Sequence, residues 1–253
     1  MSIIKAFFIS FSIYSKIPVP QFAWKEEDMR YTLCFFPWVG AVIGAAELLW
    51  WLLCSRIGIG TLCFAAVGTA IPLIVSGGFH VDGFVDTMDA FHSYQSRERK
   101  LEILKDSHIG AFAAIMLMLY YLIFFGAFSE LSEEKTIAVY AAGFFVSRCL
   151  SGVAVVSFPA AKSDGLLFLF ASSAQERIVK AALYVQLFLS FCFMLVLDVE
   201  TGAAVIATAV ACFAYYRWRC DKELGGITGD TAGWFVTVCE CAMVVSAAIV
   251  GKI

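Results

Sequence analysis

Three aspartates, Asp82, Asp86 and Asp89, follow one another at spacings of four and three residues. On an α-helix these spacings place the three carboxylates within about 60° of arc, on one face. Like charges this close repel one another unless a cation lies among them. Oxygen ligands without a set of cysteines or histidines favour Mg²⁺ or Mn²⁺, and Mg²⁺ held by carboxylates commonly completes its shell with substrate phosphates. The pattern predicts a metal site for a diphosphate, with a solvated acidic helix face as the alternative.

A second polar segment, residues 97–110, leads into an apolar stretch. Its Leu101, Leu104 and His108 fall on one face of a helix that continues through the segment, with charged residues on the flank. We therefore expect a charged helix on the same side of the protein as the acidic run.

A third polar segment, residues 224–233, is a glycine-rich turn that opens the last apolar stretch. Gly225, Gly226 and Gly229 allow backbone N–H groups to approach an anion, and the N-terminus of the following helix adds a favourable dipole. Asp230 in this turn is either the N-cap of that helix or a fourth metal ligand.

The composition is that of a membrane protein. Hydrophobic residues make up 61% of the chain and charged residues only 15%, against about 25% charged in a soluble domain. The mean hydropathy is +0.83. The nine cysteines show no zinc-binding spacing and imply no disulfide framework, and the net charge of −3 gives no reason to expect a nucleic-acid partner. These features predict an all-α polytopic membrane protein that is embedded in, and contacts, the lipid bilayer.

Seven stretches are long and apolar enough, or nearly so, to cross a bilayer, which requires about 20 residues. They are residues 32–54, 60–79, 109–128, 136–157, 178–197, 201–216 and 231–251. The sixth stretch is short, and only residues 198–200 separate it from the fifth. The alternative to two full spans at this place is a re-entrant hairpin. We expect residues 1–30 to form an interfacial segment, and the chain 1–253 to be one membrane domain with six to seven spanning helices.

The distribution of basic residues predicts the orientation. Most of the 18 Lys and Arg residues lie on the same side of the predicted spans as the N-terminus. The segments on that side are the N-terminal arm, 80–108, 158–180 and 217–230. Arg56, Lys135 and Lys252 are the basic residues left on the other side. Because cytoplasmic loops carry an excess of Lys and Arg, we expect the N-terminus and the acidic run to be cytoplasmic.

Arg148 falls within a predicted span. An intramembrane arginine is costly, and its presence suggests a functional site. We expect it to bind a phosphate or a carboxylate. The alternatives are snorkelling to the interface or pairing with Glu47 or Glu240, the other charges within the spans.

Five segments of the chain resemble, in the same order, motifs of the cobalamin synthase family, the adenosylcobinamide-GDP ribazoletransferases. GGFHVDGFVDTMD at 77–89 is similar to the family's GG-LH-DGLAD-AD signature, and RKLEILKDSHIG at 99–110 is similar to its R-LEIMKDSRIG. The remaining three segments are 17–20, 36–44 and 225–230. Together the motifs span residues 17–233, with His108 standing where the family has arginine.

The resemblance implies a reaction. The family transfers the adenosylcobinamide phosphoryl group from a GDP-activated donor to α-ribazole or its 5′-phosphate, releases GMP and uses Mg²⁺. It also implies a multi-pass enzyme of a prokaryotic inner membrane with its active site on the cytoplasmic side. Further partners would be a second copy of the chain or other cobalamin-assembly enzymes.

The resemblance also suggests roles for individual residues. The carboxylates that would hold Mg²⁺ are Asp82, Asp86, Asp89 and Asp230. The catalytic group would comprise His80, Asp82, Asp86, Lys105 and Asp106. The residues that would bind substrate and its phosphates are Arg99, His108, Arg148, Gly226, Thr228 and Gly229. The general base stays open, since a purely structural His80 would leave that role to Glu102, Asp106 or Asp230.

Three other functions fit parts of the pattern. A CDP-alcohol phosphotransferase also gathers aspartates beside an Asp-Gly pair but requires DG-x2-AR, whereas Gly83 is followed by Phe-Val-Asp. An aromatic prenyltransferase needs two D-x3-D motifs, and Asp230 has no acidic partner four residues later. A cation transporter would place its acids in the middle of the membrane, whereas the acidic run lies at the end of a span. Release of GMP from GDP-activated cobinamide distinguishes a ribazoletransferase from all three.

A topology assay tests the orientation. A reporter fused at Gln95 should be cytoplasmic and one fused at Glu133 should be exported, because basic residues gather on the side of Gln95. The reverse pattern would contradict the site assignment, since GDP-linked substrates could not reach the acidic run.

Overall fold

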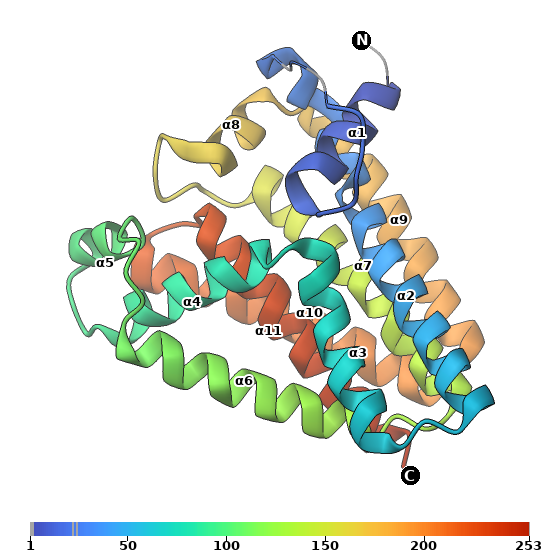
Figure 1. The fold of residues 1–253 in the computed structure, drawn as a ribbon. Helices are drawn as coiled ribbons and strands as arrows, with labels where there is room; N and C mark the ends of the chain where they lie inside the picture. The colour runs from blue at the N-terminus through green and yellow to red at the C-terminus, as the bar shows by residue number, and fades with distance from the viewer. Residues whose placement is uncertain (1–2, 22, 24, 253) are drawn as a thin grey trace.

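A computed structural model of the chain describes residues 3–21, 23 and 25–252 (Figure 1). This part of the chain is helical throughout: it contains no β-strand, and one isolated bridge joins Ala160 to Ile227. The elements, in order, are α1 (Ile3–Tyr14), the 3-10 helix η1 (Glu26–Phe35), α2 (Phe36–Ile57), α3 (Thr61–Ser76), α4 (Phe79–His92), α5 (Arg97–Ile103), α6 (Ala111–Ser129), α7 (Glu134–Ser157), α8 (Gly165–Ser173), α9 (Glu176–Leu197), α10 (Val199–Leu224) and α11 (Gly229–Val250).

Six helices of the described chain are long and apolar enough to cross a membrane, or seven if α3 and α4 count as one broken span. The six are Glu27–Ile57, which combines η1 and α2, and then α6, α7, α9, α10 and α11. The prediction of a polytopic α-helical protein with six to seven spans is therefore confirmed. The first candidate helix begins at Glu27, inside the predicted interfacial segment 1–30, whose extent stays a prediction.

The second predicted span, residues 60–79, corresponds to α3, which ends at Ser76, just before a sharp bend into α4. The axes of α3 and α4 differ by 95°, and Figure 1 shows the sharp bend between them. Gly77 and Gly78 at the bend have φ angles of 65° and 82°, a left-handed conformation that is costly for residues with a Cβ. The two glycines end α3 and redirect the chain, so α4 carries the acidic run away from the axis of the span.

The sixth predicted span is longer than residues 201–216. The observed α10 has 26 residues and α9 has 22, so each is long enough to cross, which favours two full spans over the re-entrant alternative. Asp198 allows the tight connection, because its side chain accepts a hydrogen bond from the Thr201 N–H at 2.8 Å and caps α10.

The most buried of the candidate spans is α7, which packs against α2, α9 and α11. The approach of α2 depends on Gly40 and Gly44, four residues apart. A Cβ on Gly40 would lie 2.1 Å from the carbonyl oxygen of Phe144, and one on Gly44 would lie 2.3 Å from that of Ala141. Small residues at this spacing allow two membrane helices to pack backbone against backbone.

Segments predicted to share one side of the membrane contact one another. The ion pairs between them are Lys100–Glu223 and Lys105–Asp164, the second with its charged atoms 3.9 Å apart. They connect α5 and the loop after it to the end of α10 and to the segment before α8. Three of the four predicted cytoplasmic segments therefore form one polar end of the helix bundle.

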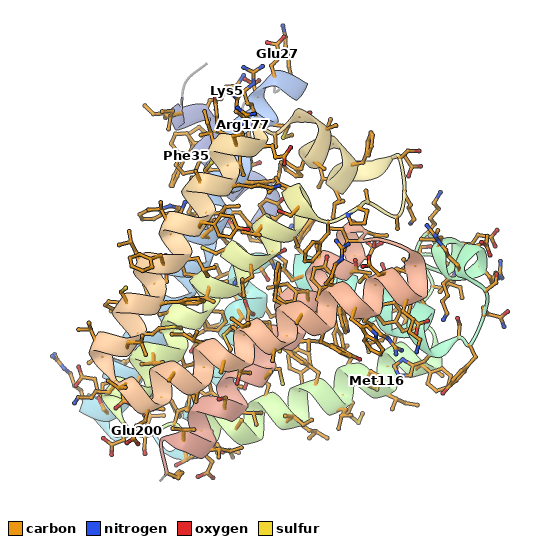
Figure 2. The ribbon with its side chains drawn as sticks, turned by 180° about the vertical axis from the view of Figure 1, so that it is seen from behind. Lys5, Glu27, Phe35, Met116, Arg177 and Glu200 are labelled. Atoms are coloured by element: carbon orange, nitrogen blue, oxygen red, sulfur yellow. The ribbon has the colours of Figure 1, made fainter. Side chains whose placement is uncertain are left out.

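The opposite end gathers the predicted external segments. Lys252 contacts Glu130 at 3.0 Å. Figure 2 shows Arg177, at the start of α9, and Glu200, just beyond its end, at opposite ends of the molecule. The grouping of the loops agrees with the predicted spans, whereas the end that faces the cytoplasm stays a prediction.

Enlarging Gly44 tests the α2–α7 contact. Gly44→Val should lower the free energy of unfolding by about 1–3 kcal/mol, because the new side chain overlaps the backbone of α7. Thermal unfolding in detergent measures the effect. The control is Gly126→Ala on α6, where an added Cβ meets nothing within 4 Å and alanine favours the helix. Equal stability of the two variants would contradict the packing.

Candidate active site

Helices α4 and α11 cross in close contact, and two glycines make the contact possible. A Cβ on Gly83 would lie 2.6 Å from the carbonyl oxygen of Asp230, and one on Gly233 would lie 2.9 Å from that of His80. Residues with a side chain would hold the two backbones further apart. The crossing therefore places the N-terminus of α11 against the first turn of α4, which carries Asp82.

The crossing adds a fourth carboxylate to the acidic run. Three negative charges act on the half-buried Asp86, namely those of Asp82, Asp230 and Asp89. The carboxylates of Asp82 and Asp86 have no ion-pair or hydrogen-bond partner in the part of the chain that the structure describes. Within that part, no group of three Asp, Glu, His or Cys residues could hold a metal ion by itself. The negative charge is concentrated and is not neutralised at Asp82 and Asp86, so a cation that also binds substrate oxygens would be stabilised here.

The carboxylate of Asp89, unlike those of Asp82 and Asp86, has hydrogen-bond partners in the described chain. Its Oδ2 accepts a hydrogen bond from the Gly110 N–H at 2.6 Å, and its Oδ1 accepts one from the Ala113 N–H at 2.9 Å. These amides belong to the N-terminus of α6, where backbone donors lack partners within the helix. Asp89 thus caps α6 from α4, and because both its oxygens are engaged, the geometry does not support the predicted metal contact.

A cavity of about 420 Å³ opens beside the crossing. We call it the aromatic cavity, because its aromatic wall is formed by Tyr14, Phe36, Phe79 and Phe170. The predicted site residues that line it are His80, Asp82, Lys105, Thr228, Gly229 and Asp230. The structure therefore gathers residues from all three polar segments of the sequence around one cavity.

A second cavity, of about 690 Å³, adjoins the first at Phe79 and Asp82, which line both. We call it the polar cavity. Its hydroxyl and charged lining residues are Ser12, Ser15, Lys16, Ser76, Asp82, Asp86, Asp106 and Ser107. The predicted Asp86 and Asp106 belong to this cavity alone, so Asp82 stands where the two cavities meet.

His80 is buried in the wall of the aromatic cavity. Its ring stacks on Tyr14 with the centroids 6.3 Å apart and lies 5.6 Å from the ring of Phe36. Neither ring nitrogen has a hydrogen-bond partner among the described residues. Both nitrogens are themselves buried from solvent, so His80 lines the cavity without presenting a ring nitrogen to it, and its role as proton acceptor or structural residue stays open.

Thr228 is the N-cap of α11. Its Oγ1 accepts a hydrogen bond from the Thr231 N–H at 3.2 Å, and its own N–H donates to the Thr231 Oγ1 at 2.8 Å. Asp230 is therefore not the N-cap, and its Oδ2 accepts a hydrogen bond from the Thr228 hydroxyl at 3.4 Å in the first turn. Thr228 and Gly229 line the aromatic cavity, so this end of the helix is positioned to meet an anion.

Gly226 does not reach either cavity lining. Its N–H donates to the carbonyl of Cys220 at 3.3 Å, which completes the end of α10. A Cβ at this position would lie 2.5 Å from the carbonyl oxygen of Pro159. Gly226 is therefore needed for the close approach of the segment around Pro159, and the geometry does not support its predicted phosphate contact.

Arg148 lies outside both cavity linings and is 1% exposed. Its Nη1 donates to Glu240 Oε1 at 2.5 Å and to the carbonyl of Phe144 at 2.9 Å. The pairing with Glu240 considered as an alternative is therefore the arrangement observed. Because this pair compensates the buried charge, the guanidinium is not presented to a substrate phosphate.

Arg99 and His108 also lie outside the cavity linings. Arg99 pairs with Glu102 at 2.6 Å, with both side chains exposed. Helix α5 ends at Ile103, so His108 lies in a loop and not on a helix face as predicted. The His108 ring and N–H bond to Asp106 at 2.6 and 3.0 Å, and these hydrogen bonds lower the pKa of Asp106. The structure does not bring either predicted phosphate ligand to the site.

Two lysines that sequence reasoning did not single out line the cavities. Lys162 lines the aromatic cavity and Lys16 the polar cavity, and neither ammonium has a hydrogen-bond or ion-pair partner in the described chain. Burial lowers the pKa of Lys162, while Asp230 opposes the lowering and Lys105 adds to it. No motif marks Lys162, and the position of Lys16 next to the segment 17–20 was the only available signal.

The fold and the site together define a class of protein: an α-helical membrane protein with an acidic cluster between two cavities. The family model described as Cobalamin-5-phosphate synthase matches residues 6–248. The chain belongs to this family, which confirms the resemblance found in its motifs.

Curated relatives agree over nearly the whole length. An adenosylcobinamide-GDP ribazoletransferase of Lachnoclostridium phytofermentans is 44% identical over 240 residues, which cover 95% of this chain and 92% of the relative. The protein of the same name from Clostridium perfringens is 30% identical over 239 residues, with 93% and 94% covered. That from Mesorhizobium japonicum is 29% identical, with 93% and 90% covered. No solved structure matches the chain. The relatives do not favour the CDP-alcohol phosphotransferase, prenyltransferase or transporter alternatives.

Substitution of Asp89 tests its structural role. Asp89→Ala should lower the free energy of unfolding by about 1–2 kcal/mol, because α6 loses its cap. Asp89→Asn keeps one acceptor oxygen and should lose less. Thermal unfolding in detergent measures both, with Asp82→Asn as the control, since that carboxylate has no partner to lose. If Asp89→Asn kept full stability but lost as much activity as Asp82→Asn, Asp89 would be a metal ligand after all.

Proposed function

We propose that the chain transfers the adenosylcobinamide phosphoryl group from its GDP-activated form to α-ribazole or α-ribazole 5′-phosphate and releases GMP. The observation that carries the proposal is the meeting of two cavities at Asp82, inside an acidic cluster. Phosphoryl transfer places the attacking and leaving oxygens on opposite sides of the phosphorus, and two adjoining cavities provide for that arrangement. The family match and the names of the relatives support the same activity.

In this reaction an acceptor hydroxyl oxygen forms a bond to the phosphorus that carries the cobinamide arm. The bond from that phosphorus to the bridging oxygen breaks, and GMP leaves with the electron pair. We assign the hydroxyl proton to His80, whose ring nitrogens lie unpaired and buried at the wall of the aromatic cavity and would have to become accessible when the acceptor binds. Lys105, in the same lining, is placed to stabilise negative charge on the phosphoryl group.

Asp82 and Asp86 are the carboxylates best suited to hold Mg²⁺, with Asp230 facing them across the crossing. They fit this ion, because Mg²⁺ needs only one or two carboxylates when substrate phosphates complete its shell, and because neither side chain has a partner. The bound ion would neutralise charge on the diphosphate. Asp89 is omitted from this set, since its oxygens cap α6.

We place the protein in a prokaryotic inner membrane with the site on the cytoplasmic side. The excess of basic residues in the segments around the site supports this orientation, as does the cytoplasmic origin of GDP-linked substrates. A second copy of the chain and other cobalamin-assembly enzymes remain proposed partners.

A GMP-release assay tests the function. Purified protein with GDP-activated adenosylcobinamide and α-ribazole should release GMP, and EDTA should abolish the release until Mg²⁺ is restored. Asp82→Asn and Asp86→Asn should each lower kcat by a factor of about 10² or more, because the ion loses a ligand.

Arg99→Gln is the matched control for charge removal, because Arg99 lies outside both cavity linings, and kcat should stay within about twofold. Wild-type protein that consumes the donor without releasing GMP would contradict the reaction. Near wild-type turnover by Asp82→Asn at millimolar Mg²⁺ would contradict the metal assignment alone.

A further inference from the structure

The two cavities that meet at Asp82 differ in chemical character. The aromatic cavity has a wall of four aromatic rings, and the polar cavity is lined largely by hydroxyl and charged groups. Each contains one lysine without a partner, Lys162 in the first and Lys16 in the second. Unpaired ammonium groups in cavities that flank a phosphoryl-transfer centre are suited to bind phosphates.

The geometry around Asp82 and Asp86 indicates where the leaving half of the donor lies. Asp86 lines only the polar cavity, whereas Asp82 lines both. A diphosphate bound at these two carboxylates therefore extends from the junction into the polar cavity. The sugar and base of GMP are rich in hydrogen-bonding groups and match the hydroxyls of Ser12, Ser15 and Ser107 there.

Lys16 is fixed at the polar cavity by the bend between α3 and α4. Its N–H donates to the carbonyl of Val75 at 2.9 Å, and its side-chain stem packs over Gly77, where an added Cβ would lie 2.3 Å from the stem. The left-handed glycine thus leaves room for the lysine stem, and Lys16 lines the same cavity as Asp82 and Asp86.

The aromatic cavity matches the other substrate. In-line transfer puts the acceptor opposite the leaving group, which is the side of Asp82 away from the polar cavity. The alkylated benzimidazole base of α-ribazole is apolar and aromatic, and Tyr14, Phe36, Phe79 and Phe170 offer rings against which it can pack. His80 in this wall is then on the side from which the acceptor hydroxyl attacks.

Lys162 is held in the aromatic cavity by the glycine-rich turn. Ala161 N–H donates to the Ile227 carbonyl at 2.8 Å, and Ile227 N–H donates to the Pro159 carbonyl at 2.9 Å. These bonds fix the backbone directly before Lys162 against the start of α11, next to Asp230. The backbone beside Lys162 is therefore fixed, while its ammonium has no ion-pair or hydrogen-bond partner among the described residues.

We propose, on the basis of the function above, that each cavity binds one substrate. The aromatic cavity is the acceptor subsite, where Lys162 binds the 5′-phosphate of α-ribazole 5′-phosphate. The polar cavity is the subsite for the GMP half of the donor, where Lys16 binds the GMP phosphate. Lys162 then determines the preference between the phosphorylated and unphosphorylated acceptors. Lys16 contributes to donor affinity and not to this preference.

Steady-state kinetics with both acceptors tests the division. Lys162→Gln should lower kcat/KM for α-ribazole 5′-phosphate by about 10–100-fold, as expected for loss of a charge-assisted hydrogen bond. The same variant should lower kcat/KM for α-ribazole no more than about threefold and leave the donor KM unchanged. Lys162→Arg should restore most of the preference for the phosphorylated acceptor. Lys16→Gln should raise the donor KM by about tenfold or more and lower kcat/KM for both acceptors equally. Lys135→Gln, an exposed residue at the opposite end of the bundle, is the control for removal of a positive charge.

If the two cavities bound the substrates the other way round, the kinetics of the lysine variants would differ. If Lys162→Gln raised the donor KM, or lowered kcat/KM for both acceptors alike, the acceptor subsite would be contradicted. Wild-type protein that releases no GMP with either acceptor would instead contradict the proposed function itself.

Chemical labelling of the wild-type protein gives a second test that does not depend on a stable variant or on turnover. Lysine acetylation is quantified by mass spectrometry with added α-ribazole 5′-phosphate, α-ribazole or GMP, each in the presence of Mg²⁺. The phosphorylated acceptor should protect Lys162 several-fold more than α-ribazole does, and GMP should protect Lys16. Protection of Lys162 by GMP, or equal protection by the two acceptors, would overturn the proposal.

Discussion

The crossing of α4 and α11 is the contact on which the candidate site depends. Because Gly83 and Gly233 lack side chains, the two backbones approach within van der Waals distance, and the carboxylate of Asp230 reaches the face of α4 that carries Asp82. These residues lie far apart in the sequence. A larger residue at either glycine would separate the acidic groups and also widen the wall between the two cavities.

Part of this arrangement could be predicted from the sequence. Hydropathy alone indicated the spans, since it measures apolar length, but it contains no information about backbone φ and so missed the bend at Gly77. The spacing of Asp82 and Asp86 indicated a charged site because helical periodicity is local. Arg148 was expected to bind a phosphate or a carboxylate at the site, with Glu240 as one alternative partner, because only tertiary packing shows that Glu240 reaches it. Lys162 was missed for the same reason, since only the turn against Ile227 brings it to the cavity.

The buried pair of Arg148 and Glu240 illustrates what the interior contributes to the site. It joins the central helix α7 to α11, with the Ser147 hydroxyl donating to the same glutamate oxygen at 3.0 Å. Removing two charges from water costs several kcal/mol, which the attraction and hydrogen bonds offset only when their geometry is good. Such a pair adds little net stability, but it restricts how α11 can rotate and slide, and thereby where Asp230 is presented.

The short helix α3 has a consequence for the surrounding lipid. With 16 residues and a rise of about 1.5 Å per residue, it extends about 24 Å, whereas the hydrocarbon core of a bilayer is about 30 Å thick. The Gly77–Gly78 bend that ends it therefore lies below the level at which the headgroups normally begin, unless the bilayer thins beside it. In either case water and headgroups would come closer to the bend than to the middle of the neighbouring longer helices. This local access of water would allow the proposed nucleotide substrate to approach Asp82, which is exposed, from the aqueous phase.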